Sequence, residues 1–127
     1  MPLNTPVIAQ ESREYWAAAR QKRLLLKHCG SCHRHFHYPR AYCPYCMSDQ
    51  TEWVQASGAG TIYSFTVIRR GPDAGTIPAF VTLAEGPTMM AGIVDAAPEA
   101  VFIGAPVRLR FVEGGEGQNI PLFELGR

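Results

Sequence analysis

The 127-residue sequence lacks the features that would mark a membrane protein, a secreted protein or a self-sufficient enzyme. Its apolar runs are far shorter than the roughly 20 residues that a membrane-spanning helix needs, so we expect no membrane contact. No stretch looks like a signal peptide. There is neither a serine nucleophile elbow nor a Walker-type phosphate loop, and the carboxylates form no evident acid–base pair. These absences indicate a cytoplasmic chain without catalytic machinery of its own.

Cysteine is scarce, but its spacing is informative. The only four cysteines form two Cys-x-x-Cys pairs, Cys29/Cys32 and Cys43/Cys46. Each turn can aim two sulfurs at one point, and two such turns together make the tetrahedral thiolate cage that Zn²⁺ prefers. The sequence therefore predicts a structural zinc ribbon with these four ligands. No cysteine then remains to act as a thiolase-type nucleophile.

Other interpretations of the cysteines are disulfides, a redox pair and an iron site. Disulfides would require an oxidising compartment. A redox Cys-x-x-Cys pair usually opens a helix after a strand, and two pairs at this spacing would be unusual. Iron in a rubredoxin-like site uses the same four thiolates, so the sequence alone leaves zinc and iron open.

Histidines alternate along a predicted strand at residues 33–38. His33, His35 and His37 would share the outward face of this strand, while Phe36 and Tyr38 would point inward. Histidines two residues apart on one face could hold a second metal. Because the cysteines already complete a tetrahedral site, we expect a solvated histidine face instead.

The chain divides into three predicted parts: a 1–23 extension with a helix, a 24–50 zinc ribbon and a 51–127 barrel. Residues 11–22 predict the helix, with Ser12 as a possible cap. The barrel strands are expected at residues 61–68, 79–84, 88–94, 106–112 and 120–125. Five strands with short turns, and a helical insert at 97–103, fit an OB-type barrel. An SH3-like barrel or a small sandwich are the alternatives, and the fold class is mainly β in each case.

Charge is distributed unevenly along the chain. The net charge is +1, yet residues 1–50 hold seven basic and three acidic side chains, against five basic and eight acidic in residues 51–127. A nucleic-acid-binding barrel would normally carry a basic stripe. The acidic barrel half therefore argues against nucleic acid as the ligand.

Two residue pairs are candidates for binding. Tyr15 and Trp16 either pack their helix against its own domain or anchor the helix on another protein, since aromatic residues dominate interface hot spots. Arg69 and Arg70 follow the first barrel strand, where OB folds commonly place a ligand-contacting loop. They could meet the phosphates of coenzyme A, or they could belong to an ordinary solvated turn.

The order of motifs resembles one family, over roughly residues 11–125. The motifs are a Tyr-Trp helix, two Cys-x-x-Cys pairs around Tyr38-Pro39-Arg40, the Ser57-to-Thr66 segment, Glu85-Gly86-Pro87 and Ile103-Gly104-x-Pro106-Val107. This is the rubredoxin-like zinc ribbon plus OB-fold family found beside acyl-CoA enzymes. His33 stands where many relatives have glycine.

The resemblance implies an accessory role. Such proteins are small subunits of thiolase-like enzymes, and sometimes of hydratases, that act on acyl-CoA esters in the degradation of aromatic or steroid compounds. The catalytic residues would belong to the partner. A single-stranded nucleic-acid-binding protein is the main alternative, followed by a stand-alone acyl-CoA carrier or a redox protein.

Overall fold

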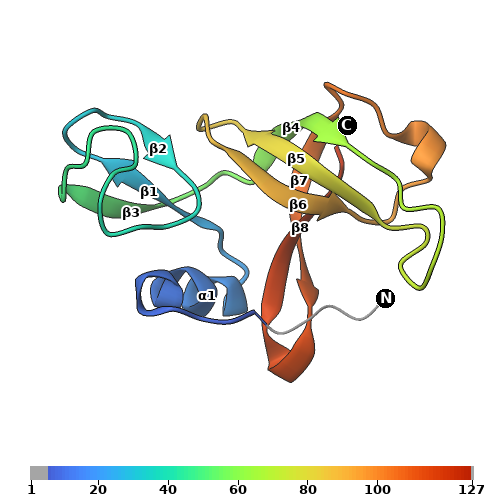
Figure 1. The fold of residues 1–127 in the computed structure, drawn as a ribbon, viewed down its shortest axis with the longest axis horizontal. Helices are drawn as coiled ribbons and strands as arrows, with labels where there is room; N and C mark the ends of the chain where they lie inside the picture. Colours follow the sequence, from blue (N-terminus) through green and yellow to red (C-terminus); the bar gives the residue numbers. More distant parts are fainter. Residues whose placement is uncertain (1–5, 127) are drawn as a thin grey trace.

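The computed structural model describes residues 6–126 and confirms a mainly β chain with an N-terminal helix, a four-cysteine ribbon and a closed five-stranded barrel. The ribbon lies at one end of the molecule and the barrel at the other, with the helix beside the barrel's last hairpin (Figure 1).

The helix is shorter than the sequence predicts. A 3₁₀ turn, η1 (Gln10–Ser12), leads into α1 (Arg13–Arg20), and the backbone turns to a positive φ at Lys22. The hydroxyl of Ser12 is hydrogen bonded to Ala9 and makes no cap on α1, contrary to the expected role. One face of α1 buries tyrosine and alanine side chains, so tertiary packing supports this two-turn helix.

The ribbon sheet has the order β2-β1-β3. Its strands are β1 (Leu25–Cys29), β2 (His35–Phe36) and β3 (Thr51–Gln55). The last of these, β3, lies beyond the predicted ribbon range of 24–50 and pairs antiparallel with β1 along its whole length.

The predicted strand at 33–38 is reduced to the two residues of β2. Phe36 is buried as expected, but Tyr38 is exposed and His37 points inward, where it meets the helix. The alternation fails because the chain leaves the sheet after Phe36 and turns towards α1, so the strand period no longer applies.

The barrel strands are adjacent in the order β4-β5-β6-β8-β7, and β4 also pairs with β7, which closes the barrel. All pairings are antiparallel except that of β6 with β8. A 3₁₀ turn, η2 (Pro98–Ala100), occupies the predicted insert, and η3 (Gly115–Gly117) lies in the last hairpin. The strands are β4 (Ala59–Phe65), β5 (Ile77–Leu83), β6 (Thr88–Ile93), β7 (Pro106–Glu113) and β8 (Asn119–Leu125).

Glycine allows β4 to curve closely over β5. A Cβ at Gly60 would lie 2.8 Å from the carbonyl oxygen of Thr82 and 2.9 Å from Val81 Cγ1. A register shift between Ile62 and Ser64 follows, which marks a β-bulge. Bulges bend and twist a strand, and this one helps the sheet to close.

Apolar packing differs between the two ends of the molecule. A single large core runs through the barrel and takes in Tyr15 and Ala18 of the helix and the start of β1. Away from this core, the ribbon has a small separate cluster of Cys29, Phe36 and Cys43, with Cys32 against it. The buried amide of Gln118 links the helix to the barrel by donating to the carbonyl of Trp16 at 3.1 Å.

Candidate metal centre and neighbouring surfaces

The four cysteine sulfurs converge on one point, as predicted from their spacing. All four Sγ atoms lie within 4.8 Å of one another, and the Cys29–Cys46 and Cys32–Cys43 pairs are each 3.6 Å apart. A tetrahedral ion with Zn–S bonds of about 2.3 Å places its sulfurs about 3.8 Å apart. The cage therefore fits one tetrahedral metal ion with four thiolate ligands.

Two turns of matching geometry hold the sulfurs. In each, the residue after the second cysteine donates its amide to the first cysteine's carbonyl: His33 to Cys29 and Met47 to Cys43, both at 2.8 Å. Each of these residues has a positive φ, 64° at His33 and 66° at Met47. The left-handed conformation is one that glycine adopts without steric cost and other residues adopt less readily.

Backbone amides also point at the sulfurs. The amide of Cys32 lies 3.4 Å from Cys29 Sγ, and that of Tyr45 lies 3.4 Å from Cys43 Sγ. The Cys32 amide is the largest cause that lowers the pKa of Cys29, to about 6, whereas burial and the neighbouring thiols raise the pKa of Cys32 and of Cys46. Hydrogen bonds from backbone amides favour the thiolate, which is the form that binds metal.

A histidine cluster lies beside the cage. His28 and His35 are cross-strand neighbours with ring centroids 4.8 Å apart, and His28 Nδ1 is 3.1 Å from Glu52 Oε1. The pairing of His28 with His35 depends on strand register, so His28 was not among the residues predicted to belong to a site. Within residues 6–126, only the four cysteines form a group of three or more metal-type side chains with ligand atoms close together.

Tyr15 and Trp16, the predicted anchor pair, differ in their exposure to solvent. Tyr15 is 2% exposed and its hydroxyl is hydrogen bonded to His37 Nε2 at 3.0 Å, so it packs within this chain. Trp16 is half-buried and its Nε1 donates to the Tyr38 hydroxyl at 2.7 Å. Burial raises the pKa of Tyr15 and lowers that of His37 to about 4, so His37 is neutral at physiological pH.

A groove of about 450 Å³ opens where the helix, ribbon and barrel meet. Aromatic side chains of the helix and ribbon form one wall, and apolar residues of β6 and β8 form the other. Its lining includes Trp16, Tyr38, Met90, Pro121 and Leu122. This groove was not predicted from the sequence, because it joins segments about 100 residues apart.

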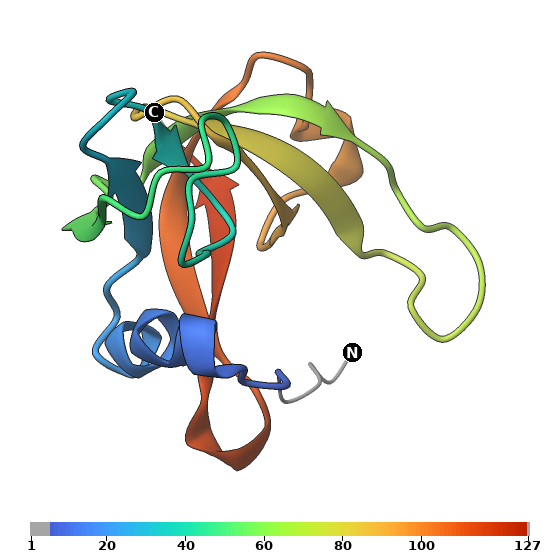
Figure 2. The same cartoon turned by 60° about the vertical axis from the view of Figure 1, so that its left-hand side comes forward.

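Arg69 and Arg70 are exposed in the loop between β4 and β5, which extends away from the barrel (Figure 2). A hollow of about 470 Å³ lies beside the loop, but its charged lining residues are Asp73 and Asp95. Carboxylates repel phosphates, so this hollow gives the arginines no support as a coenzyme A site. Their role stays a prediction.

Sequence models of known domains match both modules. Residues 16–52 match the model described as "ChsH2, rubredoxin-like zinc ribbon domain", and residues 53–112 match "ChsH2, C-terminal OB-fold domain". The chain belongs to the ChsH2 family. A solved structure agrees with this assignment. The structure described as "Ltp2-ChsH2(DUF35) aldolase" superposes on this chain with a TM-score of 0.86 at 31% identity. That match covers 95% of this chain and 98% of the other.

Curated relatives of this ChsH2-family chain differ in length. A "Probable enoyl-CoA hydratase alpha subunit" of Thermomonospora curvata is 32% identical over 93% of this chain, which spans 38% of that relative. A "DUF35 domain-containing scaffold protein" of Pyrococcus furiosus is 34% identical, over 75% of this chain and 74% of the relative. A DUF35-family structure from Sulfolobus solfataricus has a TM-score of 0.68 at 15% identity and shares the fold. In residues 6–126, no helix combines the length and apolar character needed to cross a membrane.

Proposed function

We propose that this chain is a non-catalytic, zinc-binding subunit of a thiolase-type acyl-CoA enzyme complex in the cytoplasm. The observation that carries the proposal is the match, over nearly all of both chains, to a chain of the structure described as "Ltp2-ChsH2(DUF35) aldolase". The relatives described as a hydratase subunit and a scaffold protein support the same kind of role. The metal cage supports it further, because it occupies every thiol in the chain.

Zinc is the ion that the proposal assigns to the cage. Four thiolates in a closed tetrahedral set are typical of structural zinc sites, which keep no open position for substrate. The cage would hold the two ribbon turns in place and supply no chemistry. Metal analysis of protein purified from its native source tests this, and iron with a visible charge-transfer band would contradict it.

Acyl-CoA binding would be shared with the partner. We propose that the complex handles acyl-CoA esters of aromatic or steroid-like acids, with Arg69 and Arg70 close to the coenzyme A phosphates. Arg69→Ala should then leave assembly intact and raise the apparent KM for the acyl-CoA. Arg20→Ala, which removes an exposed arginine from the helix, is the matched control and should leave KM unchanged.

Assembly itself is tested by co-expression. The chain would be produced with the thiolase-like or hydratase-like subunit encoded beside it, purified through a tag on one protein and analysed by mass and by activity. We expect a stable complex with acyl-CoA activity and an inactive isolated chain. Turnover of acyl-CoA by the chain alone, or no assembly with either enzyme class, would refute the proposal.

Trp16 is the proposed docking residue on the helix, since Tyr15 is buried within this chain. Trp16→Ala should weaken the complex by about 2 kcal/mol if the ring is a hot spot. Tyr38→Phe removes the same hydrogen bond but keeps both rings, so it separates the loss of that bond from the loss of the ring. If Trp16→Ala assembles like wild type, the docking role of this residue is wrong.

A further inference from the structure

One part of the barrel wall carries no charge. The strands β4, β5 and β6 contain no Asp, Glu, Lys or Arg. By contrast, β7 and β8 carry ionic side chains that pair across the surface: Glu124 lies 3.0 Å from Arg108 and 3.7 Å from Arg110. The charge pattern therefore divides the barrel surface into an ionic part and an uncharged part.

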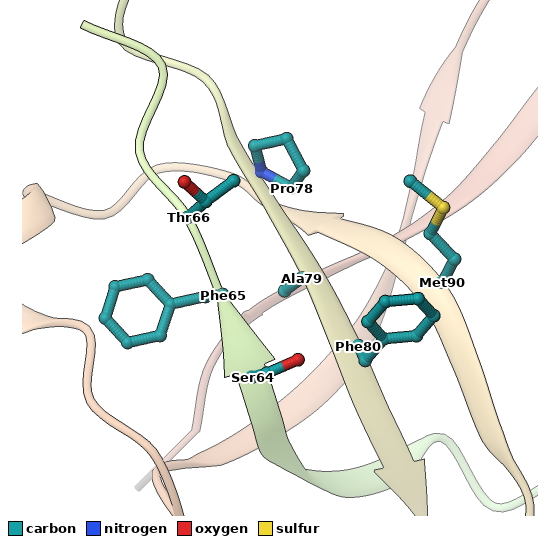
Figure 3. Close-up of a pocket in the computed structure, with 7 residues that line it drawn as sticks. All are labelled: Ser64, Phe65, Thr66, Pro78, Ala79, Phe80 and Met90. Carbon is teal, nitrogen blue, oxygen red and sulfur yellow. The ribbon is translucent and has the colours of Figure 1, made fainter.

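The outward positions of β4–β6 form regular rows. Strand register places Ser64, Phe80 and Met90 in one row, and Thr61, Thr82 and Thr88 in the next. Figure 3 shows Phe80 and Met90 side by side on adjacent strands. Both side chains line a hollow of about 250 Å³. We call the outward side chains of β4–β6 the uncharged face.

Large apolar side chains on this face are open to solvent. Tyr63 is 66% exposed, Phe80 46% and Met90 67%. Aromatic residues and methionine are enriched at the centres of protein interfaces, and charged residues are depleted there. An exposed barrel wall with this composition has the character of an interface core.

The uncharged face continues into the groove beside the helix. Met90 lines both the hollow on the face and the groove that contains Trp16 and Tyr38. The combined surface therefore runs from β4 across β6 to α1. It includes both Trp16, the proposed docking residue of the helix, and Tyr63 of the barrel.

We propose that the uncharged face, together with the adjoining groove, is the surface on which the acyl-CoA-enzyme subunit docks. This rests on the proposed function and specifies which part of the chain carries it. The partner would present an uncharged apolar surface with a convex element that enters the groove at Met90. Burying Phe80, Met90 and Tyr63 against such a surface removes apolar area from water without stranding a charge.

Other occupants fit the face less well. Single-stranded nucleic acid needs cations along its phosphates as well as aromatic rings, and the three strands supply none. A second copy related by a two-fold axis through Met90 would place groove against groove, and two concave surfaces do not fill each other. A different protein with a convex element meets both conditions.

The test introduces a charge into the face with a matched control. Met90→Lys puts an ammonium into the centre of the proposed interface, and Met47→Lys makes the same change at a methionine of the ribbon that is 73% exposed. Binding of each variant to the purified partner subunit would be measured by calorimetry. We expect Met90→Lys to weaken binding by at least about 30-fold and Met47→Lys to change it less than threefold. Phe80→Lys is the second test variant and should behave like Met90→Lys.

The possible outcomes distinguish an error in the proposed docking surface from an error in the proposed function. If wild type binds the partner and Met90→Lys and Phe80→Lys bind equally well, the docking surface is refuted while the subunit role stands. If wild type binds neither enzyme class, the proposed function itself fails. Circular dichroism and metal content should match wild type, because both positions are substantially exposed; a misfolded variant would contradict their placement. Self-association of the free chain that Met90→Lys abolishes would show a second copy as the occupant, and Met90-dependent binding to oligothymidine would show nucleic acid.

Discussion

The ribbon and the barrel are stabilised by different means. The barrel encloses a continuous apolar core that includes Val81 and Phe123, both fully buried. The ribbon adds Leu25 and Leu26 of β1 to that core, but around the cysteine cage it buries little besides Phe36 and the cysteines themselves. A module with so small a core needs another source of folding free energy, and the metal bound in the cage would supply it. Two modules of one chain can therefore depend on different sources of stability.

The largest expected effect comes from removing the metal. Binding of structural zinc contributes on the order of 10 kcal/mol or more to folding a small site. Cys43→Ala, or treatment with a strong chelator, should therefore unfold the ribbon turns and leave the barrel folded. Hydrogen exchange would show lost protection at the amides of His33 and Met47 and retained protection at Val81. Loss of protection at Val81 as well would show that the modules are not independent.

The converse experiment weakens the barrel. Phe123 is fully buried, so Phe123→Ala should lower the free energy of unfolding of the barrel by about 3–5 kcal/mol. Zinc content should stay at the wild-type value, since the cage lies in the other module. Phe102→Ala is the control, because Phe102 is 59% exposed and its loss should cost less than about 0.5 kcal/mol. The free energy of unfolding is measured by urea unfolding, with metal analysis in parallel. Metal loss from the Phe123 variant would show that the ribbon depends on the barrel for its stability.

A third prediction concerns the joint between the modules. His37 of the ribbon, in contact with Tyr15 of the helix, has a pKa lowered by burial from 6.5 to about 4. The unfolded chain therefore binds more protons between these values, and stability falls as pH drops from about 6.5 to 4. The contribution is at most about 3 kcal/mol.

His37→Gln should flatten that part of the pH profile, since glutamine does not titrate. Thermal unfolding of both proteins at each pH, with bound zinc measured alongside, separates this effect from acid release of the metal. Identical profiles for the two proteins would contradict the assignment.

The smallest expected effect is at the cage's turn. His33 holds a left-handed conformation that costs a non-glycine residue about 1 kcal/mol. His33→Gly should leave stability unchanged or raise it slightly. Arg34→Gly, one residue on, should lower it by about 0.5–1 kcal/mol through chain entropy alone. Chemical unfolding of the two glycine variants should thus differ by about 1 kcal/mol, and equal destabilisation would show that His33 is unstrained.

Local pattern was enough to predict much of this molecule. The cysteine spacing predicted a cage because ligand geometry is set within four-residue turns, and β-branched runs located all five barrel strands. The barrel type followed from the number of strands and the insert between the third and fourth, and the family match confirms it.

Features that depend on distant contacts escaped prediction. His37 faces inward because the chain bends towards α1, and the burial of Tyr15 depends on packing that no local period encodes. The groove needs Trp16 and Leu122 to meet. The uncharged face was visible as missing charge in three strands, but only register showed that Ser64, Phe80 and Met90 share a row.

Closure of the barrel has a consequence for aggregation. A closed barrel offers no unpaired strand edge, so the open sheet edges in residues 6–126 are those of β2 and β3 in the ribbon. The edge strand β2 is only two residues long, and β3 carries the exposed carboxylate of Glu52, both of which discourage strand addition by another chain. Metal loss would unfold the ribbon turns, so that backbone groups of the ribbon become available for pairing with another chain. Insoluble material formed during zinc starvation should therefore grow from the ribbon and contain barrels that are still folded.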